Sequence, residues 1–272
     1  MPAQCWIEPP MRQMSLPADV LDYILSFLES DFVTLKACSL AHPFLSQIAE
    51  RYLYSTLKLQ HGGVIACTGF QMSEFNQFLL NTPRIGSFVR TVVVQIRPEL
   101  LSDPVHISSI LQQLSLVKRV SLIQQDSRAD LSWEKFPETF RQAFLKCLGL
   151  QSMKELSLES VTNFPLSVLK DCKTIKTLEL DHSVVTGDTL AHPLPPIESL
   201  SLRGGQKHLH KVLPWLEKLN IRSLSFCGFL RDSKDSDVLS DLLACCANYL
   251  TTLDLDVVGE CMSCQSNQMF CD

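Results

Sequence analysis

Cysteine and histidine are the side chains of this sequence best suited to hold a metal, and two short motifs space them closely. Cys261 and Cys264 form a Cys-x-x-Cys pair, and His208 and His210 form a His-x-His pair. A structural zinc site needs four ligands, usually from two such pairs. No second Cys-x-x-Cys pair exists, and Cys271 leaves the set one ligand short. On a helix the two histidines would point about 200° apart, so the sequence predicts no metal site.

The motifs of common catalytic and cofactor sites are also missing. The sequence contains no glycine-rich phosphate loop, no His-Glu-x-x-His and no nucleophile-elbow motif. The glycine pairs at 62–63 and 204–205 stand alone, and the first is better explained as a turn. We therefore expect no catalytic residue and no cofactor, so this chain is predicted not to be an enzyme.

Composition narrows the possible partners. The 272 residues are 46% hydrophobic with a net charge of −5, which is ordinary for one large or two smaller globular domains. No Lys/Arg-rich run is present, which argues against nucleic acid and anionic membrane as partners. No apolar window is long enough for a membrane span, and the N-terminal residues do not form a signal-peptide pattern. The eleven cysteines are an odd, scattered set, which favours a reducing compartment and a cytoplasmic or nuclear location.

The elements that must carry function begin with two short amphipathic segments in residues 15–44. With ~100° per residue, the apolar side chains of the helix expected over 17–28 cover an arc of about 180°. A helix facing one core needs an arc of about 100°. Asp31 is expected to cap a second helix over 32–40, and Pro43 to begin a third. Three helices in about forty residues form a weak domain, so another surface must cover the surplus apolar side chains.

The stretch "LPADVLDYILSFLESDFVTLKACSL" resembles the F-box, the adaptor-binding motif of substrate receptors in SCF-type cullin–RING ubiquitin ligases. It has the Leu-Pro start, the aliphatic pairs, the Ile-Leu pair and the Cys-Ser-Leu run, and Phe44 stands near the position of the family's Trp. The resemblance implies an SCF adaptor as partner, with cullin bound indirectly. It assigns the adaptor contacts to Leu16, Pro17, Val20, Leu21, Ile24, Leu25, Leu28, Leu40 and Phe44.

The rest of the sequence repeats one short pattern, apolar-x-x-apolar-x-apolar. Clear copies begin at residues 153, 175, 197, 221 and 250, and looser copies at 89 and 117. Helix-like segments lie between them, at 140–148, 207–219 and 237–246. A unit of this length cannot fold alone, so the units must stack. The pattern resembles leucine-rich repeats without their usual Asn, whose place is taken by Val161, Ser183, Gly205, Phe229 and Val258.

Together these patterns predict an α/β fold: an N-terminal three-helix F-box followed by an irregular leucine-rich-repeat solenoid with a parallel curved sheet. The expected parts are the F-box at 15–58, a connector at 59–84, the solenoid at 85–258 and a C-terminal tail at 259–272. F-box proteins with irregular repeats are abundant in mushroom-forming fungi, and the whole chain resembles one. The resemblance implies a substrate receptor of an SCF ubiquitin ligase. The alternative is a leucine-rich-repeat interaction scaffold without ligase coupling.

The residues between the Leu positions are expected to face outward along each strand. In the five clear copies this outward set is acidic with one basic member, which favours a basic segment of an unknown protein substrate. The alternative is a solvated face that binds nothing. The candidate substrate-binding residues are Glu155, Glu159, Glu179, Asp181, Arg203, Asp254 and Asp256.

Overall fold

The computed structural model of the chain describes residues 16–60, 63–65, 69–97, 104–125, 132–186, 195–204, 219–230 and 233–259. The chain forms two compact units, divided between Leu53 and Tyr54. The Cys-x-x-Cys pair, the His-x-His pair and the expected tail from residue 260 onward lie outside the described residues. No helix in the described ranges is both long enough and apolar enough to cross a bilayer.

The first unit consists of three helices, α1 (Ala18–Ser26), α2 (Phe32–Ala41) and α3 (Pro43–Leu53). Asp31 caps α2, as expected, because its carboxylate accepts a 3.0 Å hydrogen bond from the Thr34 backbone N–H. The first helix is two residues shorter at its C-terminal end than the sequence predicts. Residues 27–30 form turns instead, in which the backbone N–H groups of Phe27, Leu28 and Glu29 still bond to carbonyls three residues earlier.

A small core holds these helices together. Its buried apolar members are Leu25, Leu35, Ile48, Ala49 and Leu53. The Tyr52 hydroxyl donates a 3.0 Å hydrogen bond to the Asp22 carbonyl, which ties α3 to α1. Helices α1 and α2 each supply a single buried side chain to this core, and α3 supplies three.

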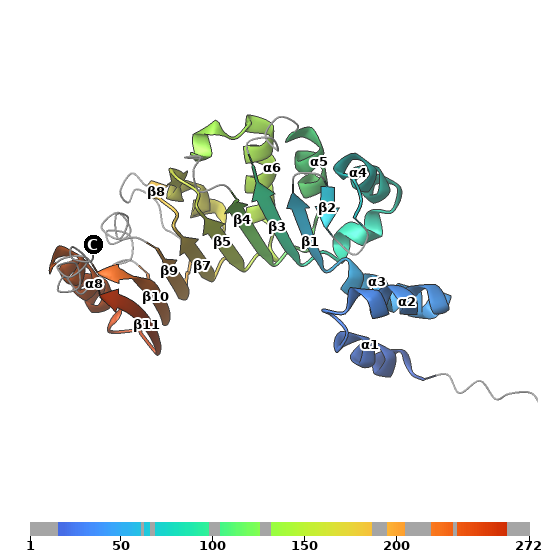
Figure 1. Cartoon of the computed structure of the whole chain (residues 1–272), viewed down its shortest axis with the longest axis horizontal. Coiled ribbons are helices and arrows are strands. Elements are labelled where there is room, and N and C mark those ends of the chain that lie inside the picture. The colour runs from blue at the N-terminus through green and yellow to red at the C-terminus, as the bar shows by residue number, and fades with distance from the viewer. Residues whose placement is uncertain are drawn as a thin grey trace, which may run out of the picture. The chain divides into compact units, whose positions relative to one another are not determined.

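The second unit is built on a nine-stranded sheet in the order β11-β10-β9-β7-β5-β4-β3-β1-β2 (Figure 1). Eight strands are parallel, and β2 pairs antiparallel with β1 at one edge. The α/β class with a parallel sheet is therefore confirmed. The strands are β1 (Thr56–Gln60), β2 (Gly63–Ile65), β3 (Thr91–Ile96), β4 (Arg119–Gln124), β5 (Glu155–Glu159), β7 (Thr177–Asp181), β9 (Ser199–Arg203), β10 (Ser223–Leu230) and β11 (Thr252–Gly259).

The connections between strands contain both α-helices and short 3-10 helices. The region 59–84, expected as a connector, holds the end of β1, all of β2 and all of the first helix of the sheet unit. Between β5 and β7 the chain forms a short 3-10 helix that the sequence patterns do not indicate. The described segments are α4 (Met72–Asn81), η1 (Pro83–Ser87), α5 (Pro104–Gln113), η3 (Trp133–Lys135), α6 (Glu138–Leu148), η4 (Leu166–Asp171) and α8 (Ser233–Cys246), with the short strands β6 (Phe164–Pro165) and β8 (Val185–Thr186).

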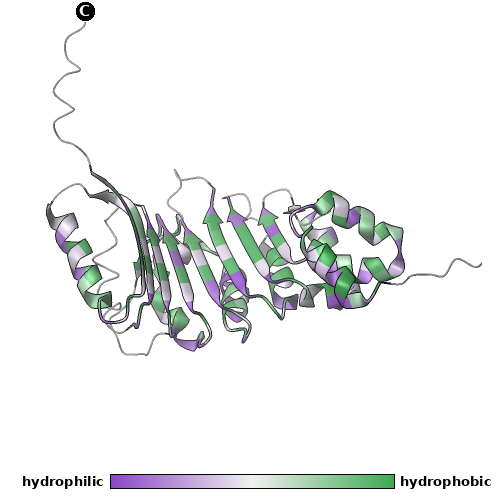
Figure 2. Cartoon of the chain, turned by 90° about the horizontal axis from the view of Figure 1, so that it is seen from below, coloured by the Kyte–Doolittle hydropathy of each residue, from purple (hydrophilic) through white to green (hydrophobic). Residues whose placement is uncertain are grey.

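Alternation along the strands separates the core from the outer face. In β5, β7 and β9 the Leu side chains are buried and their neighbours are partly or fully exposed, a banding visible along the arrows in Figure 2. Leu156, Leu178 and Leu200 are each at most 1% exposed. Aromatic rings extend this core on the side of α6, where Trp133 meets Phe164 edge-to-face at 4.9 Å between ring centroids.

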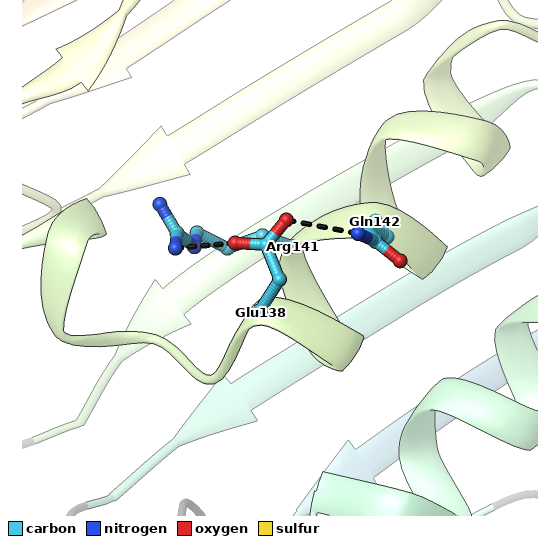
Figure 3. A network of polar contacts seen from close by, with 3 residues as sticks. All are labelled: Glu138, Arg141 and Gln142. Carbon is cyan, nitrogen blue, oxygen red and sulfur yellow. Dashed lines mark hydrogen bonds and ion pairs between the residues drawn. The ribbon is translucent and has the colours of Figure 1, made fainter.

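The first turns of helix α6 carry side-chain contacts between residues of the helix itself. The Glu138 carboxylate accepts a hydrogen bond from Arg141 and a 3.0 Å hydrogen bond from the Gln142 amide (Figure 3). An acidic residue in the first turn also favours the positive end of the helix dipole. These contacts stabilise the first turns of the helix, whose buried face carries Phe140 and Phe144.

Strands β5, β7 and β9 are each followed directly by a residue with a left-handed backbone conformation. Ser160, His182 and Gly204 have φ values of 57°, 48° and 100°. Their N–H groups donate to carbonyls of the next strand, those of Asp181, Arg203 and Cys227, at 2.7, 2.8 and 3.0 Å. A Cβ on Gly204 would lie 2.5 Å from the His182 ring, so this position requires glycine.

Ser183 stands at one of the positions where leucine-rich repeats usually have Asn, and its hydroxyl bonds to the backbone. The buried Ser183 hydroxyl accepts a 3.0 Å hydrogen bond from the Val161 N–H and donates one of 3.1 Å to the Asp181 carbonyl. A buried backbone donor needs such a partner. Ser183 therefore joins neighbouring repeats through their backbones.

Candidate functional site

The three-helix unit exposes more large apolar side chains than its size leads one to expect. Of the sixteen large hydrophobic residues that are exposed in the described chain, nine fall between residues 16 and 44. We call these nine the apolar surface. They are Leu16, Val20, Tyr23, Ile24, Phe27, Phe32, Val33, Leu40 and Phe44.

On α1 the wide apolar arc divides into two halves. Val20 and Ile24 are 38% and 45% exposed, whereas Leu25 is 3% exposed. At ~100° per residue these two exposed positions lie about 100–140° from Leu25 around the helix. One half of the arc therefore packs in the core of the unit, and the other half stays partly exposed.

The residues assigned to the adaptor fall into three groups. Leu16, Pro17, Val20, Ile24, Leu40 and Phe44 are exposed, and Leu21 and Leu28 are half-buried. Leu25 belongs to the core of the unit. A partner would therefore touch the first group directly, while Leu25 holds the helix in place.

The F-box resemblance assigns no adaptor contact to four further exposed residues, Tyr23, Phe27, Phe32 and Val33. Tyr23 and Phe27 are 66% and 70% exposed, and their rings meet edge-to-face at 4.8 Å. Both lie within about 20° of Leu16 on the same helical wheel. The angular position was therefore sufficient to find them.

A second candidate surface is the outer face of the sheet. The registers place Glu159, Asp181 and Arg203 opposite one another on three neighbouring strands. Neighbouring strands lie about 4.8 Å apart, so their side chains form one row. The same registers place Ser157, Glu179 and Ser201 in the adjoining row.

A shallow cavity of about 240 Å³ opens between these two rows. Four of the seven predicted substrate-binding residues line it, namely Glu159, Glu179, Asp181 and Arg203. Ser157 and Ser201, which have short side chains, also line the cavity. The cavity is therefore polar and mainly acidic.

The acidic groups of the cavity affect one another. Burial and the nearby Asp181 carboxylate raise the pKa of Glu159, while His182 opposes the shift. The His182 Nε2 lies 3.7 Å from the Asp181 Oδ1, so a protonated His182 would form an ion pair there. A cation bound in the cavity would offset the repulsion between the two carboxylates.

The other three predicted substrate-binding residues lie apart from the cavity. Glu155 forms an ion pair with Arg119 of the neighbouring strand β4. Asp254 and Asp256 are on β11, three strands from β7, where Asp254 accepts a 3.4 Å hydrogen bond from Ser225. The registers show that Asp254 and Asp256 continue the two rows of the cavity on β11, beyond Ser225 and Cys227 of β10.

Two core cysteines are poor candidates for chemistry. Burial raises the pKa of the Cys147 thiol to about 12 and that of Cys172 to about 11, so both stay protonated at neutral pH. The reactive form of cysteine is the thiolate. No group of three or more His, Cys, Asp or Glu side chains in the described ranges is placed to hold a metal ion.

Comparison with known proteins gives no further guide to either surface. No protein-family model matches the chain, and none of the curated proteins matches it.

Proposed function

We propose that this protein is the substrate-recognition subunit of an SCF-type ubiquitin ligase, with an F-box in its first unit and irregular leucine-rich repeats in its second. The first unit would bind the SCF adaptor, and the sheet unit would hold the protein to be modified. Other subunits would carry out the transfer of ubiquitin. The resemblance of residues 16–40 to the F-box motif supports the first half of this proposal.

The observation that carries the proposal is the apolar surface of the three-helix unit. Burying a Leu, Ile or Phe side chain contributes about 1.5–3 kcal/mol relative to leaving it in water. Tyr23, Ile24 and Phe27 are each at least 45% exposed. A protein partner that covered them would therefore gain substantial binding energy from a short helix.

The proposed substrate is a protein with a basic segment. The cavity between β5, β7 and β9 presents Glu159, Glu179 and Asp181 together. Complementary charge directs such recognition and fixes the register of the bound segment. Arg203 adds a positive group at the cavity wall, which would orient an acidic or carbonyl oxygen of the same segment.

Adaptor binding tests the first half of the proposal. Wild type and the double variant Leu16→Asp/Ile24→Asp are compared in a pulldown with purified SCF adaptor. Both positions are exposed, so the variant is expected to stay folded and to lose adaptor binding by more than about tenfold, since two charges would enter an apolar interface. Circular dichroism checks the fold.

A matched control is Ser30→Asp/Gln47→Asp, which adds the same charge at exposed positions outside the apolar surface. The control is expected to bind like wild type. Adaptor retained by the Leu16/Ile24 variant, or never bound by wild type, would favour the interaction scaffold without ligase coupling.

Binding of a lysine octapeptide tests the second half of the proposal. The triple variant Glu159→Gln/Glu179→Gln/Asp181→Asn removes the acidic groups of the cavity without adding bulk. The control Glu29→Gln/Glu134→Gln/Asp171→Asn makes the same change in net charge at exposed sites elsewhere. We expect only the first variant to weaken binding, and equal loss in both variants would reduce the effect to net charge.

A further inference from the structure

Positive side chains form a row at the N-terminal ends of the parallel strands. The residue preceding each strand from β3 to β11 forms a backbone hydrogen bond with its counterpart on the next strand: Lys118 N–H to Arg90 O at 2.7 Å, and Lys154 N–H to Lys118 O at 2.8 Å. Further along the sheet the same kind of bond runs from Lys176 N–H to Lys154 O, from Glu198 N–H to Lys176 O and from Arg222 N–H to Glu198 O, each at 2.8 Å. We call this row the basic edge.

Five of the seven residues in this row are basic and one is acidic. The row is Arg90, Lys118, Lys154, Lys176, Glu198, Arg222 and Thr251. In the sequence successive basic residues of this row are 22–46 positions apart, so they form no charged run. The parallel register brings them to neighbouring rungs about 4.8 Å apart. Figure 1 shows the starts of these strands aligned along one edge of the sheet.

Only part of this charge is balanced within the described chain. Lys176 forms a 2.8 Å ion pair with Glu198, and the Arg90 guanidinium donates to the carbonyls of Ser87 and Leu116. The side chains of Lys118, Lys154 and Arg222 make no ion pair in the described ranges, and Lys118 and Arg222 are exposed. Like charges on neighbouring strands repel one another and destabilise the pair. An external anionic group would remove that cost.

The carboxylates of the cavity stand at the opposite ends of the same strands. Lys154 precedes β5 and Glu159 is its last residue; Lys176 precedes β7 and Asp181 is its last residue. Five residues of strand span about 17 Å. The sheet unit is therefore basic along one edge and acidic along the other, and the two edges are far enough apart to bind different partners.

We propose that the basic edge binds an acidic segment of a protein in extended conformation. From β3 to β10 the sheet makes five steps between strands, or about 24 Å at ~4.8 Å each. About seven extended residues cover that length at ~3.4 Å per residue. This surface is separate from the cavity and does not depend on the proposed substrate or adaptor.

A protein segment fits this edge better than nucleic acid does. Single-stranded nucleic acid binds where basic groups alternate with exposed aromatic rings on which its bases stack. No large apolar or aromatic side chain is exposed between Leu116 and Tyr249 in the described residues. The acidic opposite edge and the net charge of −5 would also repel a polyanion longer than the row.

Fluorescence anisotropy with a labelled glutamate octapeptide tests the proposal on the full chain. Wild type is compared with Lys118→Glu/Lys154→Glu and with the control Lys36→Glu/Lys58→Glu, which makes the same change in charge at exposed lysines outside the row. We expect the first variant to lose roughly tenfold or more in affinity, because like charges would then face the peptide. The control should bind within about twofold of wild type, and salt should weaken binding.

Two further probes decide the class of partner. A thymidine nonanucleotide carries eight phosphates, and vesicles of phosphatidylserine present an anionic surface. The proposal is overturned if either probe binds more tightly than the glutamate peptide, if wild type does not bind that peptide, or if both double variants lose binding equally. Binding of the lysine octapeptide should be retained by the Lys118/Lys154 variant, so failure here is distinguishable from failure of the proposed substrate cavity.

Discussion

The three-helix unit and the sheet unit differ in how completely they cover their apolar side chains. In the sheet, Leu156, Leu178 and Leu200 each lie between strands on both sides and are at most 1% exposed. In the helices, the outward half of α1 is only partly covered, and Ile24 stays 45% exposed. Small units have too little interior for their apolar surface.

The last described strand shows that the number of neighbours decides burial. Leu253 and Leu255 occupy the positions of Leu224 and Phe226 one strand earlier, yet they are 46% and 41% exposed while those two are 0% and 2%. Among the described strands β11 has a partner on one side only. The same residue type is therefore core or surface according to what stacks beside it.

The largest expected effect is in the sheet unit. Phe144→Ala removes a fully buried ring that contacts Trp133 and Phe140. We expect the free energy of unfolding to fall by about 3–5 kcal/mol, as measured by urea denaturation followed by circular dichroism. The control Leu80→Ala, at a residue that is 55% exposed, should change it by less than about 0.5 kcal/mol.

A smaller difference should separate two adjacent residues of α1. Leu25→Ala leaves a cavity in the helical core and should cost about 2–3 kcal/mol. Ile24→Ala removes an exposed side chain and should cost less than about 1 kcal/mol. Hydrogen exchange at the amides of α1 to α3 measures both. Equal costs would mean that the outward half of the arc is covered after all.

The cap of α2 should make the helical unit sensitive to acid. Hydrogen bonds from the Thr34 backbone and side chain lower the pKa of Asp31 from 3.8. Because the folded-state pKa lies below the unfolded one, the stabilisation is complete above pH 3.8 and is lost as the pH falls through the folded value. Asp31→Ala should therefore be less stable than wild type at neutral pH, and the two should converge in acid. A difference that persisted in strong acid would contradict the role of the carboxylate.

The smallest expected effect concerns stability at the acidic cavity. Burial and Asp181 raise the pKa of Glu159, so its protonated form favours the folded state and this benefit is lost as the pH rises through the folded pKa. Glu159→Gln should be as stable as wild type at neutral pH or more stable by less than about 0.5 kcal/mol, since solvent screens the group. The difference should shrink in acid. A loss of stability at neutral pH would show that the carboxylate holds the strand end together.

Much of the fold was predictable from local patterns. Alternating Leu positions identified β5, β7, β9, β10 and β11, because a strand half-buried in a sheet repeats every two residues. Strand β1 was missed although Leu57 and Leu59 alternate in the same way, because it begins only three residues after the last helix of the first unit. The 3-10 helix η4 was also missed, since its sequence carries no marked helical period.

The sequence by itself determined which residues alternate, where Asp31 caps a helix and that α1 carries more apolar side chains than one core can use. Only the tertiary structure decided which half of α1 stays exposed, which acidic residues share a cavity and which lysines stand in a row. Periodicity acts within one element and depends on backbone geometry alone. Charge grouping depends on the register between strands more than twenty residues apart in sequence, which is fixed when the strands pair.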